Sequence, residues 1–244
     1  MVSAGSTGAL LASGMVRLGR IKGVERPALA TVIPSRKRPF LLIDSGANVD
    51  CLPKYLVQFG MMGSVYMHRI LGVDEPRVGL VNIGAEAEKG NQLTKETFKL
   101  MQAQAQFRFE GNVEARDIPS GDIDVVVADG FAGNLILKYT EGLAQALVGM
   151  LKDEIQSSRK SMLGAAMMKD AFQSFKARMD YEEQGGAPLL GVNGAVVKAH
   201  GSSTARAFKN AIGQAYRMVK TGMVAEIEKG IAEIAQAEKK EENA

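Results

Sequence analysis

Asp129, Asn134 and Lys138 follow directly after the apolar run Val125–Ala128, and this stretch is the part of the sequence best suited to chemistry. A short β-branched run is typical of a strand covered on both faces, and two glycines separate it from a helix that we expect to begin at Asn134. Open α/β sheets bind ligands at the carboxyl ends of their strands, and a helix N-terminus favours an anion. An ordinary helix N-cap accounts for the same residues equally well, so the stretch alone leaves both interpretations open.

Three more loops of small and polar residues adjoin predicted strands and helices: Ser3–Gly8, Gly84–Asn91 and Gly201–Ser203. Backbone N–H groups and hydroxyls in such loops can hold an anion. In a doubly wound sheet we expect these loops and residues 130–134 to converge on one edge. The predicted phosphate- or substrate-binding residues are Ser3, Gly5, Ser6, Thr7, Asn91, Asp129, Gly130, Gly133, Ser202 and Ser203.

No covalent nucleophile is evident in the sequence. Cys51 lies where a helix is expected to start, without a sequence cue to a neighbouring base, and the G-x-S-x-G motif is absent. The two histidines make a histidine-rich metal site improbable, and there is no G-x-G-x-x-G dinucleotide motif, so we expect neither a metal nor a cofactor. Anion-binding loops without a nucleophile indicate that phosphate, or a phosphorylated compound, is itself a reactant.

The composition is that of a soluble globular protein, with 244 residues of which 46% are hydrophobic and 23% charged. One cysteine excludes an internal disulfide and fits a reducing compartment. Neither a signal peptide nor an apolar run long enough to span a membrane is apparent. We therefore expect a cytoplasmic protein.

The net charge of +3 is unevenly distributed, because residues 1–38 carry a balance of +6 and the remainder carries −3. Such a basic lobe favours an acidic partner, which can be a phosphate-bearing ligand, an acidic carrier protein or a membrane surface. A solvated basic face without any partner is the competing interpretation. Nucleic acid is not expected, since the basic residues lack interleaved aromatic residues.

Alternating strands and helices predict a single three-layer α/β sandwich with a mostly parallel, doubly wound sheet. The short basic linker between the first two strands indicates one antiparallel hairpin within it. Strands are expected at residues 27–33, 40–43, 77–84, 107–113, 125–128 and 195–200. Helices are expected at residues 9–17, 50–63, 94–104, 134 onward and 204–218.

Residues 141–183 predict a helical hairpin that is inserted in the α/β domain. Met168, Phe172, Phe175 and Met179 form one helical stripe, which is typical of a core or a dimer seam. Met162, Leu163 and Met167 lie near the tip between basic residues, a pattern that also suits shallow insertion into an anionic membrane. The charged tail, residues 226–244, is expected to fray into solvent.

Several segments together resemble the PlsX family of bacterial phosphate acyltransferases, in collinear order over nearly the whole chain. They are Ser3–Leu10, Arg26–Ala30, Gly46–Asp50, Pro76–Leu80, Lys89–Asn91, Gly111–Glu114, Asp129–Asn134 and Lys198–Ser203. Two departures stand out. The family's first segment, a strand followed by an Asp-Ala-Met-Gly-Gly-Asp loop, has no counterpart here, so we expect an amino-terminally truncated member whose activity needs testing. Ser6 stands where the family usually has asparagine.

The resemblance implies transfer of a long acyl chain from acyl carrier protein to inorganic phosphate, giving acyl phosphate for phospholipid synthesis. It implies catalytic roles for Lys89 and Asn134, and a fold similar to phosphotransacetylases and isopropylmalate dehydrogenases. It also implies a homodimer in peripheral contact with the membrane, where a membrane glycerol-3-phosphate acyltransferase is the expected neighbour. Our own inference adds His200, which can protonate the departing thiolate or can simply be a hydrogen-bonded edge residue.

Two other functions remain open at this point. A short-acyl phosphotransacetylase would use coenzyme A in place of the carrier protein as its thioester. An inactive, membrane-associated scaffold would keep the fold and lose the chemistry.

Overall fold

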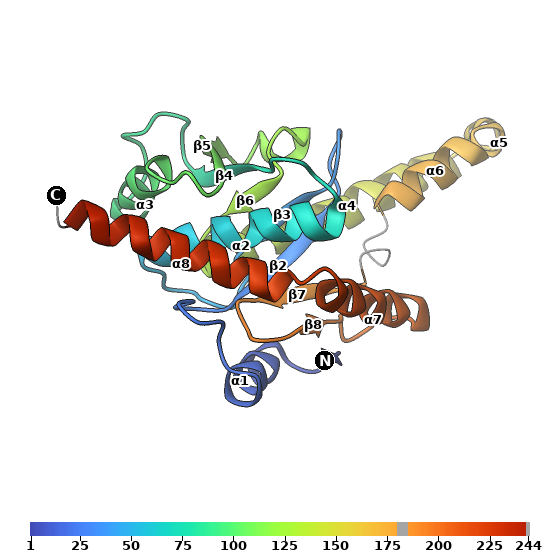
Figure 1. Ribbon diagram of the computed structural model, residues 1–244. Coiled ribbons are helices and arrows are strands. Elements are labelled where there is room, and N and C mark those ends of the chain that lie inside the picture. Colours follow the sequence, from blue (N-terminus) through green and yellow to red (C-terminus); the bar gives the residue numbers. More distant parts are fainter. Residues whose placement is uncertain (180–184, 243–244) are drawn as a thin grey trace. The chain divides into compact units, whose positions relative to one another are not determined.

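The computed structural model describes residues 1–179 and 185–242, without the side chains of Met179, Glu238 and residues 240–242. Two compact units are present: Met1–Asn134 with Tyr181–Ala244, and Leu135–Asp180. Among the described residues of the first unit, eight strands form one sheet in the order β1-β8-β7-β2-β3-β6-β4-β5 (Figure 1). The strands are β1 Val2–Ser3, β2 Ala28–Ile33, β3 Phe40–Ile43, β4 Arg77–Asn82, β5 Arg108–Glu114, β6 Val125–Val127, β7 Ala187–Leu190 and β8 Val197–Lys198.

Apolar strands in the middle of the sheet form the core. Every residue of β3 and β6 is buried, as expected for β-branched and leucine-rich runs covered on both faces. Helix α2 (Pro53–Leu71) packs on them so closely that a Cβ at Gly63 would stand 2.5 Å from Val125. The predicted helix at residues 50–63 is therefore longer than expected and ends at a left-handed Gly72.

The sheet is parallel on one side and changes direction in its middle. Strands β3, β6, β4 and β5 run parallel, whereas β2 is antiparallel to both β3 and β7. The predicted β2–β3 hairpin is thus confirmed, and residues 187–190, which are not among the strands expected from the sequence, form strand β7. Because β8 is antiparallel to β7 and parallel to β1, strands β1 and β8 run opposite to β3, β6 and β4.

Four more helices belong to the first unit: α1 Thr7–Arg17, α3 Gln92–Gln102, α7 Ala205–Lys220 and α8 Met223–Glu242. The last of these corrects an expectation, because residues 226–242 of the charged tail are helical and do not fray. Helix α8 lies alongside α2 (Figure 1). Ile227, Ile231 and Ile234 are buried against the core. Burial of this stripe outweighs the charges on the other face of the helix.

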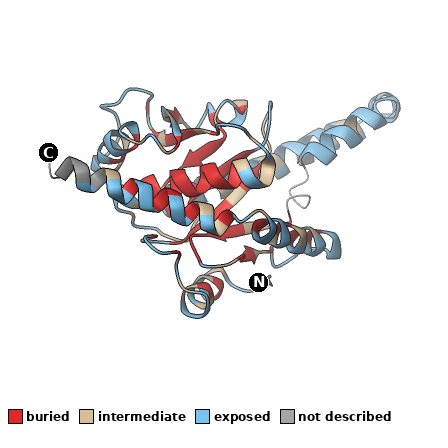
Figure 2. Cartoon of the chain, viewed as in Figure 1, coloured by how far each residue is buried: buried red, intermediate tan, exposed pale blue. Residues whose placement is uncertain are grey.

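The second unit consists of most of helix α4 (Gly130–Gln156) with α5 (Arg159–Met167) and α6 (Lys169–Met179). Helix α4 begins at Gly130, four residues before the predicted start. The returning arm of the hairpin predicted at residues 141–183 is broken at Met168, and residues 180–184 lie outside the described residues. The described side chains of the second unit are mostly exposed (Figure 2), including Leu163 at 68% and Met167 at 85% of full exposure.

Candidate active site

Three loops meet at the carboxyl ends of β3, β6 and β4, which are neighbouring parallel strands. Val127 of β6 pairs with Ile43 on one side and Leu80 on the other, so the three strands end at nearly the same level. The loop after β3 is residues 44–48, the loop after β6 leads into α4, and the loop after β4 carries Lys89. Loops of three neighbouring parallel strands therefore converge at this edge, as they do at the ligand-binding edge of open α/β sheets.

Asp44 organises the first loop. Its carboxylate, fully buried, accepts backbone N–H bonds from Leu29, Gly46, Ala47 and Asn48, and a further bond of 2.9 Å from the Asn48 side chain. Burial raises the pKa of Asp44 above its ordinary value, although these N–H groups act in the opposite direction. Among the described residues, the hydrogen bonds of the carboxylate are to its own loop and to β2, so this aspartate holds the loop in place.

Two glycines let helix α4 approach that loop. A Cβ at Gly133 would overlap the carbonyl oxygen of Asp44, and a Cβ at Gly130 would stand 2.5 Å from the carbonyl oxygen of Asn48. The Gly130 N–H donates to that same Asn48 oxygen at 2.7 Å. Only glycine fits at either position, which explains the spacing of the motif that begins at Asp129.

The close contact between α4 and the Asp44 loop fixes the position of Asn134. Its Cβ lies 3.4 Å from where a Cβ of Gly46 would be, a position with a φ of +130° that glycine adopts without strain. The Asn134 side chain is exposed, and among the described residues no hydrogen bond engages its amide. Packing therefore fixes the backbone of Asn134, and its side-chain amide is accessible to a ligand.

Lys89 is held through its backbone. The buried Asn82 side chain donates to the Lys89 carbonyl at 3.0 Å and accepts the Ile83 N–H at 2.8 Å. The next residue, Gly90, has a φ of +92° and leaves no room for a Cβ beside Asn82. The Lys89 side chain is exposed, and no described residue forms an ion pair with it.

Several predicted anion-binding groups serve as helix caps in this structure. Asn91 accepts the Thr94 N–H at the start of α3, Asp129 accepts the Ala132 N–H in α4, and Ser6 accepts the Ala9 N–H in α1. The capping interpretation of these positions accounts for those contacts. A role for the same residues in binding phosphate stays a prediction.

The expectation that four loops converge on one edge is wrong. The loops that follow β1 and β8 lie at the opposite ends of strands, because these two strands run against β3, β6 and β4. The physical reason is the strand pairing: β2 is antiparallel to both β3 and β7, and β7 is antiparallel to β8. Strand β8 therefore runs opposite to β3. The candidate residues separated in this way from Asn134 and Lys89 lie at the end of β1, at the start of α1 and in the two loops: Ser3, Gly5, Ser6, Thr7, His200, Ser202 and Ser203.

The second group forms local contacts of its own. His200 is exposed, its Nδ1 lies 2.7 Å from Ser202 Oγ, and it accepts the Ser202 N–H at 3.2 Å. Ser3 Oγ accepts the Gly5 N–H, and the Ser3 carbonyl accepts the Ala199 N–H. Candidate residues from both ends of the sequence are thus brought together here, apart from the edge that carries Asn134.

The basic lobe is partly neutralised within the chain. Arg38 pairs with Asp124 at 2.7 Å, Arg77 pairs with the same fully buried carboxylate at 3.1 Å, and Lys37 pairs with Asp122. These pairs brace the amino-terminal ends of β3, β6 and β4. Lys37 and Arg38, two of the basic residues that the sequence suggested were available to a partner, are thus engaged within the chain.

Cys51 is unsuited to nucleophilic attack. Burial raises the pKa of its thiol to about 12, and the neighbouring aspartates, Asp44 foremost, act in the same direction. In the part of the chain that is described, no group of three or more histidine, cysteine, aspartate or glutamate side chains is arranged to hold a metal ion.

Sequence reasoning missed three residues of this edge as site residues: Asp44, Asn48 and Asn82. A signal for the first two was present, because a glycine-containing polar loop follows the predicted strand at 40–43 just as one follows residues 125–128. Asn82 lies inside an apolar strand, and nothing in the sequence marks it as the support of Lys89.

A family model described as "Fatty acid synthesis protein" matches residues 1–226 of this chain. A protein named "Phosphate acyltransferase" from Clostridium botulinum (strain Loch Maree / Type A3) is 52% identical over 97% of the chain and 70% of its own length. The chain belongs to the PlsX family of phosphate acyltransferases. A "Phosphate acyltransferase" from Clostridium perfringens (strain SM101 / Type A) is likewise 52% identical, over 95% of this chain and 68% of its own length.

Solved structures of phosphotransacetylases share the fold of this PlsX family member. The phosphotransacetylase from Streptococcus pyogenes matches with a TM-score of 0.58 and 17% identity, over 90% of this chain and 63% of that one. The EutD phosphotransacetylase from Staphylococcus aureus matches with a TM-score of 0.56 and 15% identity, over 92% and 62%. The α/β fold similar to phosphotransacetylases is thereby confirmed.

Proposed function

We propose that this chain transfers a long-chain acyl group from the thioester of acyl carrier protein to inorganic phosphate, releasing acyl phosphate and the carrier thiol. The observation that carries the proposal is the pair Asn134 and Lys89 at the ends of adjacent parallel strands, both exposed and both fixed through their backbones. Family membership supports the same reaction.

The two side chains suit two different tasks. Phosphate is already anionic at neutral pH and needs placement more than deprotonation, and the Lys89 ammonium can bind it or offset its charge. The Asn134 amide can donate to the thioester oxygen as that oxygen becomes an oxyanion. Phosphate oxygen then bonds to the acyl carbon, the carbon–sulfur bond breaks, and the sulfur leaves as a thiolate.

His200 is proposed with less structural support, because no described contact links it to Asn134 or Lys89. Its proton would have to reach the thiolate from a loop at the far end of oppositely directed strands. It therefore stays a prediction, to be tested beside Asn134.

The experiment that tests the function supplies the chain with phosphate and one of three acyl thioesters. Palmitoyl–acyl carrier protein, palmitoyl-coenzyme A and acetyl-coenzyme A are compared, and acyl phosphate is trapped with hydroxylamine. We expect product chiefly from the carrier thioester. Preference for acetyl-coenzyme A would favour a short-acyl phosphotransacetylase, and no product from any donor would favour a scaffold without catalysis.

A homodimer through the second unit is part of the proposal. Within that unit, Phe175 is 51% exposed, Met168 is 56% exposed and Phe172 is half-buried, so the predicted stripe does not form a closed core there. Large exposed apolar patches mark interaction sites. Sedimentation of the chain and of a Phe175→Asp variant measures the dimer, which the substitution is expected to dissociate.

Peripheral membrane contact is the remaining part, and α5 supports it. None of the helices in the described residues is long and apolar enough to cross a membrane. Met162, Leu163 and Met167 are exposed, and burying three such side chains is worth roughly 4–9 kcal/mol at about 1.5–3 kcal/mol each. We expect Met162→Asp with Leu163→Asp to abolish flotation with anionic vesicles without dissociating the dimer.

A further inference from the structure

The loop that joins β4 to α3 contains a tight turn held by asparagines from two adjacent strands (Figure 1). The Lys89 N–H donates to the Glu86 carbonyl at 3.2 Å, which closes the turn. The side chain of Asn112, on β5, donates to that same carbonyl at 2.9 Å. At the other end of the turn, the Asn82 side chain donates to the Lys89 carbonyl at 3.0 Å. Side chains of the sheet therefore fix the backbone of both Glu86 and Lys89.

A β-bulge in β5 brings Asn112 to the side of the sheet that it needs for this contact. Val78 of β4 pairs with Phe109, and Leu80 pairs with Asn112, so β5 contains one extra residue between the two pairs. Val78 and Leu80 lie on one face of β4, and their partners Phe109 and Asn112 therefore share a face too. Phe109 packs edge-on against Phe98 of α3, with the ring centres 5.3 Å apart. Asn112 thus lies on the α3 side of the sheet, toward which the loop runs.

The side chains of Glu86 and Lys89 lie beside one another over Gly84. A Cβ at Gly84 would stand 2.8 Å from Glu86 Oε2 and 3.0 Å from Lys89 Cγ, so the glycine leaves room for both. Both side chains are exposed, and within the described part of the chain neither forms an ion pair. A carboxylate, which only accepts hydrogen bonds, therefore neighbours an ammonium, which only donates them.

Such a pair can distinguish two oxyanions of similar size and shape. At neutral pH inorganic phosphate retains at least one proton and can donate a hydrogen bond, whereas sulfate retains none and only accepts. A lysine ammonium attracts both anions. A carboxylate beside it accepts the hydrogen bond of the P–OH group, but it faces sulfate with like charge and no donor between them. Discrimination of this kind comes from the repulsive contact with the wrong ligand as well as from the attractive contact with the right one.

We propose that Glu86 selects protonated phosphate over sulfate at Lys89. The inference deepens the proposed function and rests on it for the placement of phosphate at Lys89. In this arrangement Lys89 attracts the oxyanion, and Glu86 accepts the hydrogen of its P–OH group. Because one fixed turn carries both residues, the ammonium and the carboxylate meet the same anion.

The test measures binding of inorganic phosphate and of sulfate to the full chain by titration calorimetry, at neutral pH and constant ionic strength. We expect the parent to bind phosphate at least about tenfold more tightly than sulfate. In Glu86→Gln the new amide can donate to either anion, so the preference should shrink to within about twofold. Lys89→Ala should weaken the binding of both anions.

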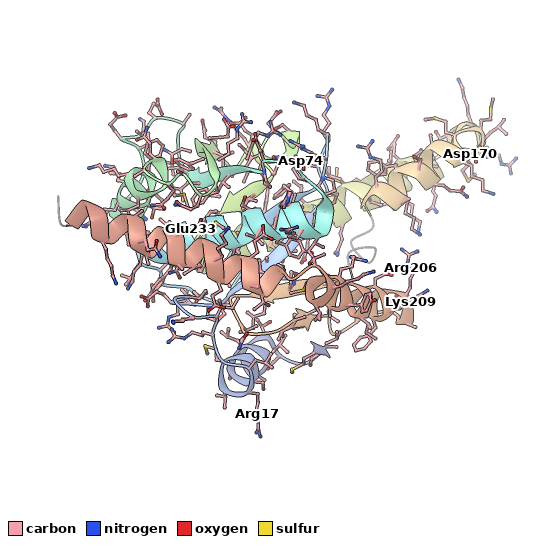
Figure 3. The ribbon with its side chains drawn as sticks, viewed as in Figure 1. Arg17, Asp74, Asp170, Arg206, Lys209 and Glu233 are labelled. Atoms are coloured by element: carbon pink, nitrogen blue, oxygen red, sulfur yellow. The ribbon has the colours of Figure 1, made fainter. Side chains whose placement is uncertain are left out.

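Two control variants make the same change of charge at other positions. Glu88→Gln makes it within the same loop, and Glu233→Gln makes it on α8, where Figure 3 shows this residue. Both should keep the preference of the parent. The ratio of the two affinities is the informative quantity, because a distorted turn would weaken the binding of both anions together.

An unchanged ratio in Glu86→Gln would overturn the proposal, and so would an equal loss of preference in Glu88→Gln, which would reveal a general effect of charge. A parent chain without phosphate binding or without the preference would overturn it too. The same holds for unchanged phosphate affinity in Lys89→Ala, because the anion would then lie elsewhere.

Acyl-phosphate formation separates this inference from the proposed function. A chain that prefers phosphate through Glu86 but forms no acyl phosphate from any donor would contradict the proposed function alone. A chain that forms acyl phosphate and keeps its full preference in Glu86→Gln would contradict the role of Glu86 alone.

Discussion

The two groups of polar loops in the first unit differ in what holds them. At the ends of β3, β6 and β4, glycines at 130 and 133 bring backbone into contact with backbone, and a buried aspartate gathers the N–H groups of its loop. At the ends of β1 and β8, the loops are exposed, and the side chains of Ser3 and His200 form hydrogen bonds with residues two positions away. Rigid placement of a side chain requires packing beneath it, and the close approach of α4 to the Asp44 loop provides such packing beneath Asn134.

This difference shows that the types of residue in a loop do not by themselves identify a functional site. Both groups contain glycines, hydroxyls and helix starts, and both appear in the residues that resemble the family. The first edge leaves Asn134 and Lys89 open above a packed base, whereas at the second edge the exposed His200 is engaged with its neighbour Ser202. The following predictions test that contrast.

Gly133→Ala is expected to have the largest effect. The new Cβ would overlap the Asp44 carbonyl oxygen, and the backbone of α4 and of the Asp44 loop would both have to move. We expect a loss of at least about 2 kcal/mol in the free energy of unfolding, with loss of turnover. Thermal unfolding measures it, and Gly201→Ala at the other edge is the control because nothing lies within 4 Å of its added Cβ. Equal melting temperatures for the two variants would contradict the packing argument.

Asn134→Ala should lower kcat about 10²–10³-fold with the fold intact, since one oxyanion donor is removed. His200→Ala, at the other edge, should have a smaller effect, which we place within about tenfold. Hydroxylamine trapping of acyl phosphate measures both. A loss in His200→Ala as large as that in Asn134→Ala would show that the two edges act on one substrate.

Asn82→Ala removes the buried support of Lys89, and both hydrogen bonds of the side chain are lost. A buried, unpaired carbonyl costs about 1–3 kcal/mol, and the Lys89 loop is expected to shift. We predict a higher KM for phosphate with a smaller change in kcat. Asn193→Ala, an exposed position on the loop after β7, is the control. An unchanged KM in Asn82→Ala would mean that Lys89 is positioned by other contacts.

Cys51→Ser should have the smallest effect, with turnover within about twofold of the parent. At a pKa of about 12, the thiolate fraction at pH 8 is roughly 10³-fold below that of an ordinary thiol, so labelling by a disulfide reagent should be slower, although by less than that factor because a more basic thiolate is more nucleophilic. The labelling rate should rise about tenfold for each pH unit until the pH nears the pKa. Fast labelling at pH 8 in the folded chain would contradict this environment.

Much of the fold was predictable because its signals are local. The apolar runs at 28–33, 40–43 and 125–127 are strands, and the glycines after residue 128 mark a strand-to-helix turn. The direction of β7 and β8 was not predictable, since it depends on which strand each one pairs with across long separations in sequence. Helix α8 is the opposite case. Its isoleucine stripe is a local signal in the sequence, but the charged residues around that stripe led to the wrong prediction that the segment frays.

The candidate site was predictable in part for the same reason. Asn134 and Lys89 lie in short motifs that carry the resemblance, and the structure places both at one edge. The convergence of four loops was inferred from a mostly parallel, doubly wound sheet, and the antiparallel strands β2 and β7 overturn it. The side chains of Asn91, Asp129 and Ser6 cap helices. The sequence is compatible with both helix capping and phosphate binding at these positions, and it does not distinguish between them.

The most direct measurement of the central claim is acyl-phosphate formation from palmitoyl–acyl carrier protein as the phosphate concentration is varied. The parent chain, Lys89→Ala and Asn134→Ala are compared. The structure predicts that Lys89→Ala raises the KM for phosphate at least about tenfold, whereas Asn134→Ala mainly lowers kcat, by about 10²–10³-fold. Near-parental kcat and KM in both variants would contradict the assignment of the reaction to this edge of the sheet.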